Sequence, residues 1–172
     1  CMPAYVAATN GVLLSPAGQP RFRLIYVNGG GATAPGKSLE LAGRNVLRQV
    51  YNNGGSYSGS CAGSFLSGRN TNTNSMRRLG YLHIFPYNTL TTGIKKTHLG
   101  HVIPHESPFL KYYDFGGDYY VPDIYHNNGN WLSQDLLNKM KHVEVLATYD
   151  LPKNKVHEGA AIWAYKKDKA AG

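Results

Sequence analysis

Cysteine, charge and long hydrophobic runs are all scarce in this sequence. Its two cysteines, Cys1 and Cys61, cannot form the disulfide framework that holds small secreted domains together. Only 16% of the 172 residues are charged and 42% are hydrophobic, which excludes a disordered chain and a coiled coil. No apolar run approaches the roughly 18 residues of a membrane span, so we expect no span. A chain of this length can bury a core of its own, and we expect one domain over residues 1–172.

Positive charge exceeds negative charge, which is a weak clue to partners. The 18 Lys and Arg residues against 10 Asp and Glu residues give a net charge of +8, and such an excess favours acidic partners. The basic residues are nevertheless spread along the chain, with no basic helix and no aromatic RNA-binding signature, so we expect no nucleic-acid partner. The 13 Tyr residues and the recurring Asn are more typical of secreted or periplasmic proteins.

The strongest structural pattern is a strand, a helix and a second strand. Residues 22–27 (FRLIYV) form a short apolar run that predicts a buried strand, which ends in a glycine loop at residues 28–31. Apolar residues recur at helical spacing over residues 37–52, which leaves Arg44 and Arg48 mostly outward. Residues 56–60 predict the second strand. A helical crossover implies parallel strands, so the pattern predicts an α/β fold with a mostly parallel sheet flanked by helices.

The rest of the chain predicts further short elements. Strands are expected at residues 79–85, 119–126, 143–149 and 160–166, and short helices at residues 105–113 and 132–140.

Cys61 follows the second strand of this unit in a Gly-x-Cys-x-Gly pattern. A nucleophile on a sharp turn between a strand and a helix is called a nucleophile elbow. Gly59 and Gly63 would leave room for a strained backbone and for a close approach of the next element. A position next to a helix N-terminus also favours the thiolate form of a cysteine. The alternative is a buried structural cysteine, but the flanking glycines favour a nucleophile.

The glycine loop at residues 28–31 ends the neighbouring strand. In a parallel sheet the carboxyl ends of the strands meet at one edge, where ligands bind. The backbone N–H groups of Gly30 or Gly31, together with that of Ala62, are therefore candidates for an oxyanion hole beside Cys61. The alternative is a plain glycine-rich turn.

These motifs resemble those of a known superfamily. The segment YVNGGGA, the helix after it and the segment NNGGSYSGSCAGSFLSG resemble the class I glutamine amidotransferase-like superfamily. The closest resemblance is to the branch similar to the N-terminal domain of biotin–protein ligases. Weaker similarity continues through DIYHNNG, VEVLATY and EGAAI, so that residues 22–172 are covered. The resemblance implies a flavodoxin-like α/β fold with a catalytic cysteine at Cys61.

Both ends of the chain depart from the family pattern. Members of the superfamily begin with a strand, a helix and another strand before the glycine loop, whereas only 21 residues precede Phe22 here. They also end in a strand that runs into a Gly-x-His-Pro-Glu type sequence with the catalytic His, and this chain ends at Gly172 before such a sequence. Three explanations remain open: a fragment or processed product, a site built from different residues, or a second polypeptide that completes the fold.

A base for the cysteine must be sought among seven histidines. His126 ends a predicted strand just before Asn127, and we expect it to be the base within this chain. The alternative is a strand-end residue that bonds loop backbone. His157 precedes Glu158 and imitates a His–acid pair, but the resemblance puts it in a loop before the last strand.

The other titratable residues give no clear site. His98, His101 and His105 form a loose cluster without a matching Cys or carboxylate pattern, so we expect no metal and no cofactor. An acidic partner for the base could be any of three residues, because no spacing selects among them: Asp114, Asp118 and Asp123.

Together these features predict a cysteine-nucleophile amide hydrolase, amidotransferase-like or peptidase-like. Cys61 would form an acyl-thioester with a small-molecule or peptide amide. The alternative is a non-catalytic binding or regulatory protein that keeps the elbow as a scaffold and binds its ligand on tyrosines such as Tyr112-Tyr113 and Tyr119-Tyr120. A third reading makes Cys1 an N-terminal nucleophile, which the strand–helix–strand pattern argues against.

Overall fold

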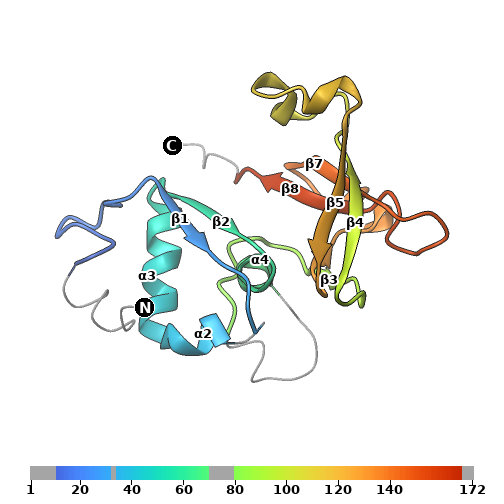
Figure 1. The fold of residues 1–172 in the computed structure, drawn as a ribbon. Coiled ribbons are helices and arrows are strands. Elements are labelled where there is room, and N and C mark those ends of the chain that lie inside the picture. Colours follow the sequence, from blue (N-terminus) through green and yellow to red (C-terminus); the bar gives the residue numbers. More distant parts are fainter. Residues whose placement is uncertain (1–10, 32–33, 70–79, 168–172) are drawn as a thin grey trace. The chain divides into compact units, whose positions relative to one another are not determined.

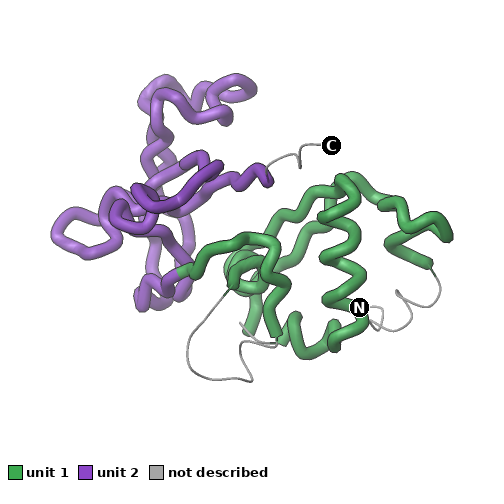
Figure 2. Tube along the Cα trace, turned by 180° about the vertical axis from the view of Figure 1, so that it is seen from behind, with its two compact units in different colours: residues 1–89 green, residues 90–172 purple. Residues whose placement is uncertain are grey.

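The chain divides into two compact units, residues 1–89 (unit 1) and residues 90–172 (unit 2), as Figure 2 shows. The computed structural model describes residues 11–31, 34–69 and 80–167. The expectation of one domain over residues 1–172 stays a prediction.

Unit 1 contains the predicted strand–helix–strand pattern. Its elements are β1 (Leu24–Val27), α2 (Ala34–Ser38), α3 (Glu40–Asn52), β2 (Ser56–Gly59) and α4 (Ala62–Ser67), as Figure 1 shows. Strands β1 and β2 pair in parallel, with Leu24 beside Ser56 and Val27 beside Gly59. Helix α3 is the crossover between them, so the predicted βαβ unit is confirmed.

The core of unit 1 lies between α3, α4 and one face of the two strands. Leu47, Leu66 and Leu82 form its buried centre, and partly buried residues pack around them, including Ile25, Val27 and Tyr57. The opposite face of β1 is exposed: Leu24 and Tyr26 keep 54% and 58% of their surface accessible. The alternation along β1 therefore covers one face of the pair and leaves the other to solvent.

Two expectations for unit 1 were wrong. Arg44 is buried and its guanidinium donates to the Gly36 carbonyl at 2.6 Å, while Arg48 donates to the carbonyls of Leu82 and Tyr81. Residues 80–85 form no strand. The Leu82 N–H donates instead to the Leu66 carbonyl at the end of α4. Long arginines thus join chain segments inside unit 1 because their heads reach backbone carbonyls that lack strand partners.

Unit 2 is built on an antiparallel sheet. Its elements are β3 (Leu90–Thr91), β4 (Thr97–Val102), η1 (Pro108–Lys111), η2 (Phe115–Gly117), β5 (Tyr120–His126), β6 (Asn130–Trp131), α6 (Gln134–Leu137), β7 (Val143–Asp150) and β8 (Ala160–Tyr165). The four-stranded sheet has the order β5-β4-β7-β8, and all neighbours are antiparallel. Strands β3 and β6 form a short antiparallel pair of their own.

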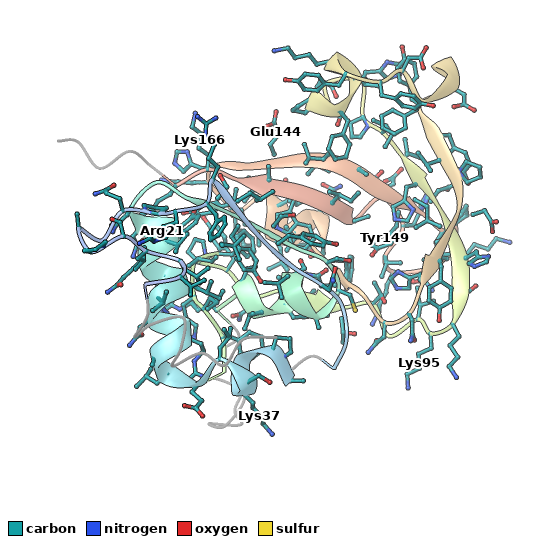
Figure 3. The ribbon with its side chains drawn as sticks, turned by 60° about the vertical axis from the view of Figure 1, so that its left-hand side comes forward. Arg21, Lys37, Lys95, Glu144, Tyr149 and Lys166 are labelled. Atoms are coloured by element: carbon teal, nitrogen blue, oxygen red, sulfur yellow. The ribbon has the colours of Figure 1, made fainter. Side chains whose placement is uncertain are left out.

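The core of unit 2 lies against this sheet and contains Leu99, Trp131, Tyr149 and Val156. Tyr149, on β7, is seen among the side chains of the sheet in Figure 3. The segment with η1 and η2 extends beyond the ends of β4 and β5 (Figure 1).

The chain is therefore a mixed α/β protein, but the expected mostly parallel sheet is not found. In the described residues the parallel pairing is limited to β1 and β2, and the other pairs are antiparallel. Parallel pairing needs a long crossover, usually a helix. The connections in unit 2 hold only 3₁₀ turns and the four-residue α6, so its strands return antiparallel. No helix in the described part of the chain is long and apolar enough to cross a membrane.

Candidate active site

Cys61 lies at the junction of β2 and α4, in a strained backbone conformation. Its φ is 50° and its ψ is −110°. A non-glycine residue in such a sparsely populated region costs about 1–3 kcal/mol and persists only where its surroundings hold it. The side chain is partly exposed and the thiol is free. The sharp turn between a strand and a helix that the sequence predicted at Cys61 is therefore present, and the role of Cys61 as a nucleophile stays a prediction.

The glycines around Cys61 allow the backbone of three elements to meet. A methyl group on Gly63 would overlap the carbonyl oxygen of Val27 at the end of β1, and one on Gly59 would overlap the carbonyl group of Gly63. The elbow therefore requires glycine at both positions, because the backbone of β1, β2 and α4 is already in contact there.

Backbone hydrogen bonds close the turn. The Ser60 N–H donates to the Val27 carbonyl at 3.0 Å, which ties the turn to the end of β1. The Gly63 N–H donates to the Ser60 carbonyl at 2.9 Å, and the Phe65 N–H donates to the Cys61 carbonyl at 3.1 Å. The turn before and after Cys61 is thus fixed on both sides.

The glycine loop after β1 begins next to Cys61. A methyl group on Gly29 would lie 3.1 Å from the Cβ of Cys61 and 3.7 Å from its sulfur. Gly30 has a φ of 148° and open space where a side chain would be. Ala62, fully buried, is the first residue of α4. The residue that the structure brings against Cys61 is Gly29, which the sequence reasoning passed over. The oxyanion roles of Gly30, Gly31 and Ala62 stay a prediction.

Tyr57 is a second residue at the elbow that the sequence did not reveal. Its hydroxyl donates to the Gly63 carbonyl at 2.6 Å. Burial raises the pKa of the Tyr57 phenol well above its ordinary value. A tyrosine four residues before a cysteine carries no signal of this contact, because the contact depends on the turn between them.

His126 lies in unit 2 and is buried, with 7% of its surface accessible. Its Nε2 lies 2.8 Å from the hydroxyl of Thr92 and accepts the backbone N–H of Gly129 at 3.3 Å. Burial lowers the pKa of His126. These contacts match the alternative in which His126 bonds loop backbone, and its role as a base stays a prediction.

A second buried imidazole, that of His101, lies close to Tyr149, which also contacts His126. His101 on β4 keeps 6% of its surface accessible, and its Nδ1 has no hydrogen-bond partner among the described residues. Its ring centre is 5.0 Å from that of Tyr149, and the His126 ring is 5.4 Å from the same residue. Burial lowers the pKa of His101, the Leu99 backbone partly opposes this, and the charge of His126 adds to it. We call these three residues the His–Tyr–His cluster.

Three other histidines, His98, His105 and His157, each have different partners and do not form one site. His98 Nδ1 lies 2.8 Å from Asp123 Oδ1 on an exposed surface, and the His105 ring packs on Tyr119. His157 accepts the Leu151 N–H at Nδ1, and its Nε2 lies 3.9 Å from Glu158. In the part of the chain that the structure describes, no three His, Cys, Asp or Glu side chains come together as a metal site.

Only one of the three candidate acidic partners contacts a histidine. Asp123 pairs with His98. Asp114 and Asp118 instead accept backbone N–H groups, from Gly116 and Tyr120 respectively.

Comparison of the chain with protein-family models, curated proteins and solved structures found no match.

Proposed function

We propose that this protein is a cysteine-dependent amide hydrolase of the class I glutamine amidotransferase-like type. The observation that carries the proposal is the backbone of Cys61, at φ 50° and ψ −110° on a strand-to-helix turn. The close packing of Gly59 and Gly63 supports it, because a strained residue is kept where the surrounding structure holds it. A structural cysteine needs no such conformation.

The reaction follows from the chemistry of a thiolate. The sulfur of Cys61 attacks the amide carbonyl and forms a tetrahedral intermediate, whose oxyanion accepts N–H groups of Ala62 and of Gly30 or Gly31. The C–N bond breaks and the amine leaves with the proton taken from the thiol. Water then hydrolyses the thioester, which releases the carboxylic acid and restores the thiol. A histidine carries the proton, either His126 or one supplied from elsewhere.

The exposed face of β1 supports a further layer of structure over this pair of strands. A pair of parallel strands is stable only as part of a covered sheet, and Leu24 and Tyr26 present apolar surface on the uncovered side. We propose that a second polypeptide or a further segment covers this face and completes a flavodoxin-like fold.

The alternative is a non-catalytic binding or regulatory protein. The segment with η1 and η2 favours it, because Tyr112 and Tyr113 keep 82% and 64% of their surface accessible. Exposed tyrosines combine an apolar ring with a polar hydroxyl and are common in binding surfaces.

Alkylation of the thiol separates the two functions. In a Cys1→Ala background Cys61 is the one thiol, and its rate of reaction with iodoacetamide is measured by mass spectrometry across a pH series. An activated nucleophile reacts rapidly below about pH 7, whereas an ordinary thiol reacts mainly above about pH 8.5. An unreactive Cys61 would favour the binding protein.

Turnover is then measured with a panel of primary and secondary amides. We expect Cys61→Ala and Cys61→Ser to reduce hydrolysis by more than about 1,000-fold with an unchanged circular dichroism spectrum. Full activity in either variant would overturn the proposal.

A further inference from the structure

We infer that Tyr57 is a positioning residue for Cys61: its hydroxyl holds the Gly63 carbonyl and so keeps the elbow in the conformation that presents the thiol. This inference rests on the proposed function of Cys61, but it concerns a different residue and has its own test.

The hydrogen bond of Tyr57 spans the elbow. Tyr57 is on β2, Gly63 is in the first turn of α4, and Cys61 lies between them. The hydroxyl donates to the Gly63 carbonyl at 2.6 Å, which is short for a bond between neutral groups. It is a side-chain hydrogen bond that joins β2 directly to α4. Moving α4 away from β2 therefore breaks this bond.

The ring of Tyr57 is itself anchored. It packs against the buried cluster of unit 1, which consists of Leu47, Leu66 and Leu82. This packing restricts the position of the ring and therefore of its hydroxyl group. Burial also raises the pKa of the phenol, so that the hydroxyl remains a protonated donor at any pH at which the protein works. An anchored donor of constant charge is suited to hold a turn.

The conformation of Cys61 is what needs to be held. At φ 50° and ψ −110° the residue would relax to a common region if α4 were free to shift. Gly59 and Gly63 permit the close contact of the backbones but do not enforce it, because glycine accepts many conformations. The hydroxyl of Tyr57 adds an attractive contact at the same carbonyl that approaches Gly59.

The test is the alkylation rate of Cys61 in Tyr57→Phe, made in the Cys1→Ala background. The substitution removes the hydroxyl and keeps the ring. We expect the rate with iodoacetamide to fall about tenfold at every pH, because the relaxed turn no longer presents the sulfur. A merely structural role of Tyr57 predicts the opposite, since a loosened unit 1 exposes the thiol and speeds alkylation.

Tyr81→Phe is the matched control. Tyr81 is also buried in unit 1 and does not belong to the turn between β2 and α4, so the rate should not change. Replacement of Tyr57 by 4-aminophenylalanine keeps both a ring and an N–H donor, and we expect it to restore most of the rate. This variant also serves if Tyr57→Phe fails to fold in a urea titration: its rate should then stay within about threefold of the parent protein, and a tenfold loss would overturn the inference.

The outcomes separate this inference from the proposed function. A folded Tyr57→Phe protein that alkylates as fast as its parent, or faster, overturns the role of Tyr57 whatever the protein catalyses. If the parent protein hydrolyses no amide of the panel, the proposed function is overturned. The comparison of alkylation rates remains valid in that case. Where hydrolysis is present, Tyr57→Phe should lower kcat about tenfold with little change in KM.

Discussion

Unit 1 and unit 2 accommodate unfavourable groups in different ways. Unit 1 joins two parallel strands through α3 and holds a strained residue, Cys61, where the backbone of three elements meets. Unit 2 pairs its strands antiparallel and buries two imidazoles, His101 and His126, each close to the ring of Tyr149. The cost is conformational in unit 1 and electrostatic in unit 2.

This difference indicates where each unit is vulnerable. Backbone strain does not respond to pH, but it fails when the close contacts around it are disturbed. Buried neutral histidines oppose folding once they must carry a charge. The comparison therefore predicts that steric changes affect unit 1 most and that acid affects unit 2 most.

The largest effect is expected from Gly63→Ala in unit 1. The added methyl group would overlap the Val27 carbonyl, and we expect unfolding of unit 1 to become easier by about 3 kcal/mol. The control is Gly31→Ala, whose methyl group would meet only an ordinary contact with Ala34 at 3.8 Å. Hydrogen exchange of α3 measures the difference. Equal protection of α3 in the two variants would contradict the close backbone contact.

A smaller effect is expected from Thr92→Val in unit 2. Thr92 is buried and its hydroxyl contacts His126 Nε2 at 2.8 Å, so the change leaves a buried nitrogen with one partner fewer. We expect a loss of about 1–2 kcal/mol in a urea titration. Thr91→Val is the control, because the Thr91 hydroxyl bonds Asn128 at the surface, and we expect less than about 1 kcal/mol there. Similar losses in both variants would show that burial of the His126 contact has no special weight.

Acid should distinguish the two units. The pKa of His101 and that of His126 are both lowered by burial, so the unfolded chain binds more protons than the folded one below the ordinary histidine pKa of about 6.5. The stability of unit 2 is therefore complete above that pH and falls as the pH drops further. Hydrogen exchange of β4 and β7, corrected for intrinsic rates, should accelerate on acidification more than that of α3.

His101→Phe sharpens the acid experiment. The change removes the Nδ1 atom that has no partner in the described residues and keeps a ring against Tyr149. We expect part of the pH dependence of unit 2 to disappear. An unchanged dependence in this variant would exclude His101 as a source of acid sensitivity.

The smallest effect on stability is expected from Tyr112→Ala. Its ring is 82% accessible, so thermal unfolding should change by less than about 0.5 kcal/mol. A larger change would mean that the segment with η1 and η2 is more closely packed than its exposure indicates. Unchanged stability with lost ligand binding would support the alternative function as a binding protein.

The elbow could be predicted from sequence because its signals are local. An apolar run, a glycine loop, a helical repeat and a Gly-x-Cys-x-Gly pattern lie within residues 22–63, and each determines its own segment. Three of the later strands were also predicted within a residue or so, as β5, β7 and β8. The apolar and β-branched residues that predicted these strands are a local property of the chain.

Pairing and side-chain partners were less predictable. The mostly parallel sheet was extrapolated from a single crossover, whereas β4, which the sequence did not reveal, is one of the two central strands of an antiparallel sheet. Residues 80–85 looked like a strand, but Leu82 and Phe85 bond the carbonyls of Leu66 and Ser67 instead. A strand-like pattern indicates that alternate residues are buried, but it does not indicate which part of the chain they pack against.

The sequence by itself determined the βαβ unit, the turn at Cys61 and the need for glycine around it, because these depend on residues close together in the chain. Tertiary structure alone decided that Tyr57 bonds Gly63 across the elbow, that Gly29 lies against Cys61, and that His101 and His126 meet at Tyr149. Such contacts depend on which strands pair and how tightly the backbone packs, and composition and spacing do not encode that directly.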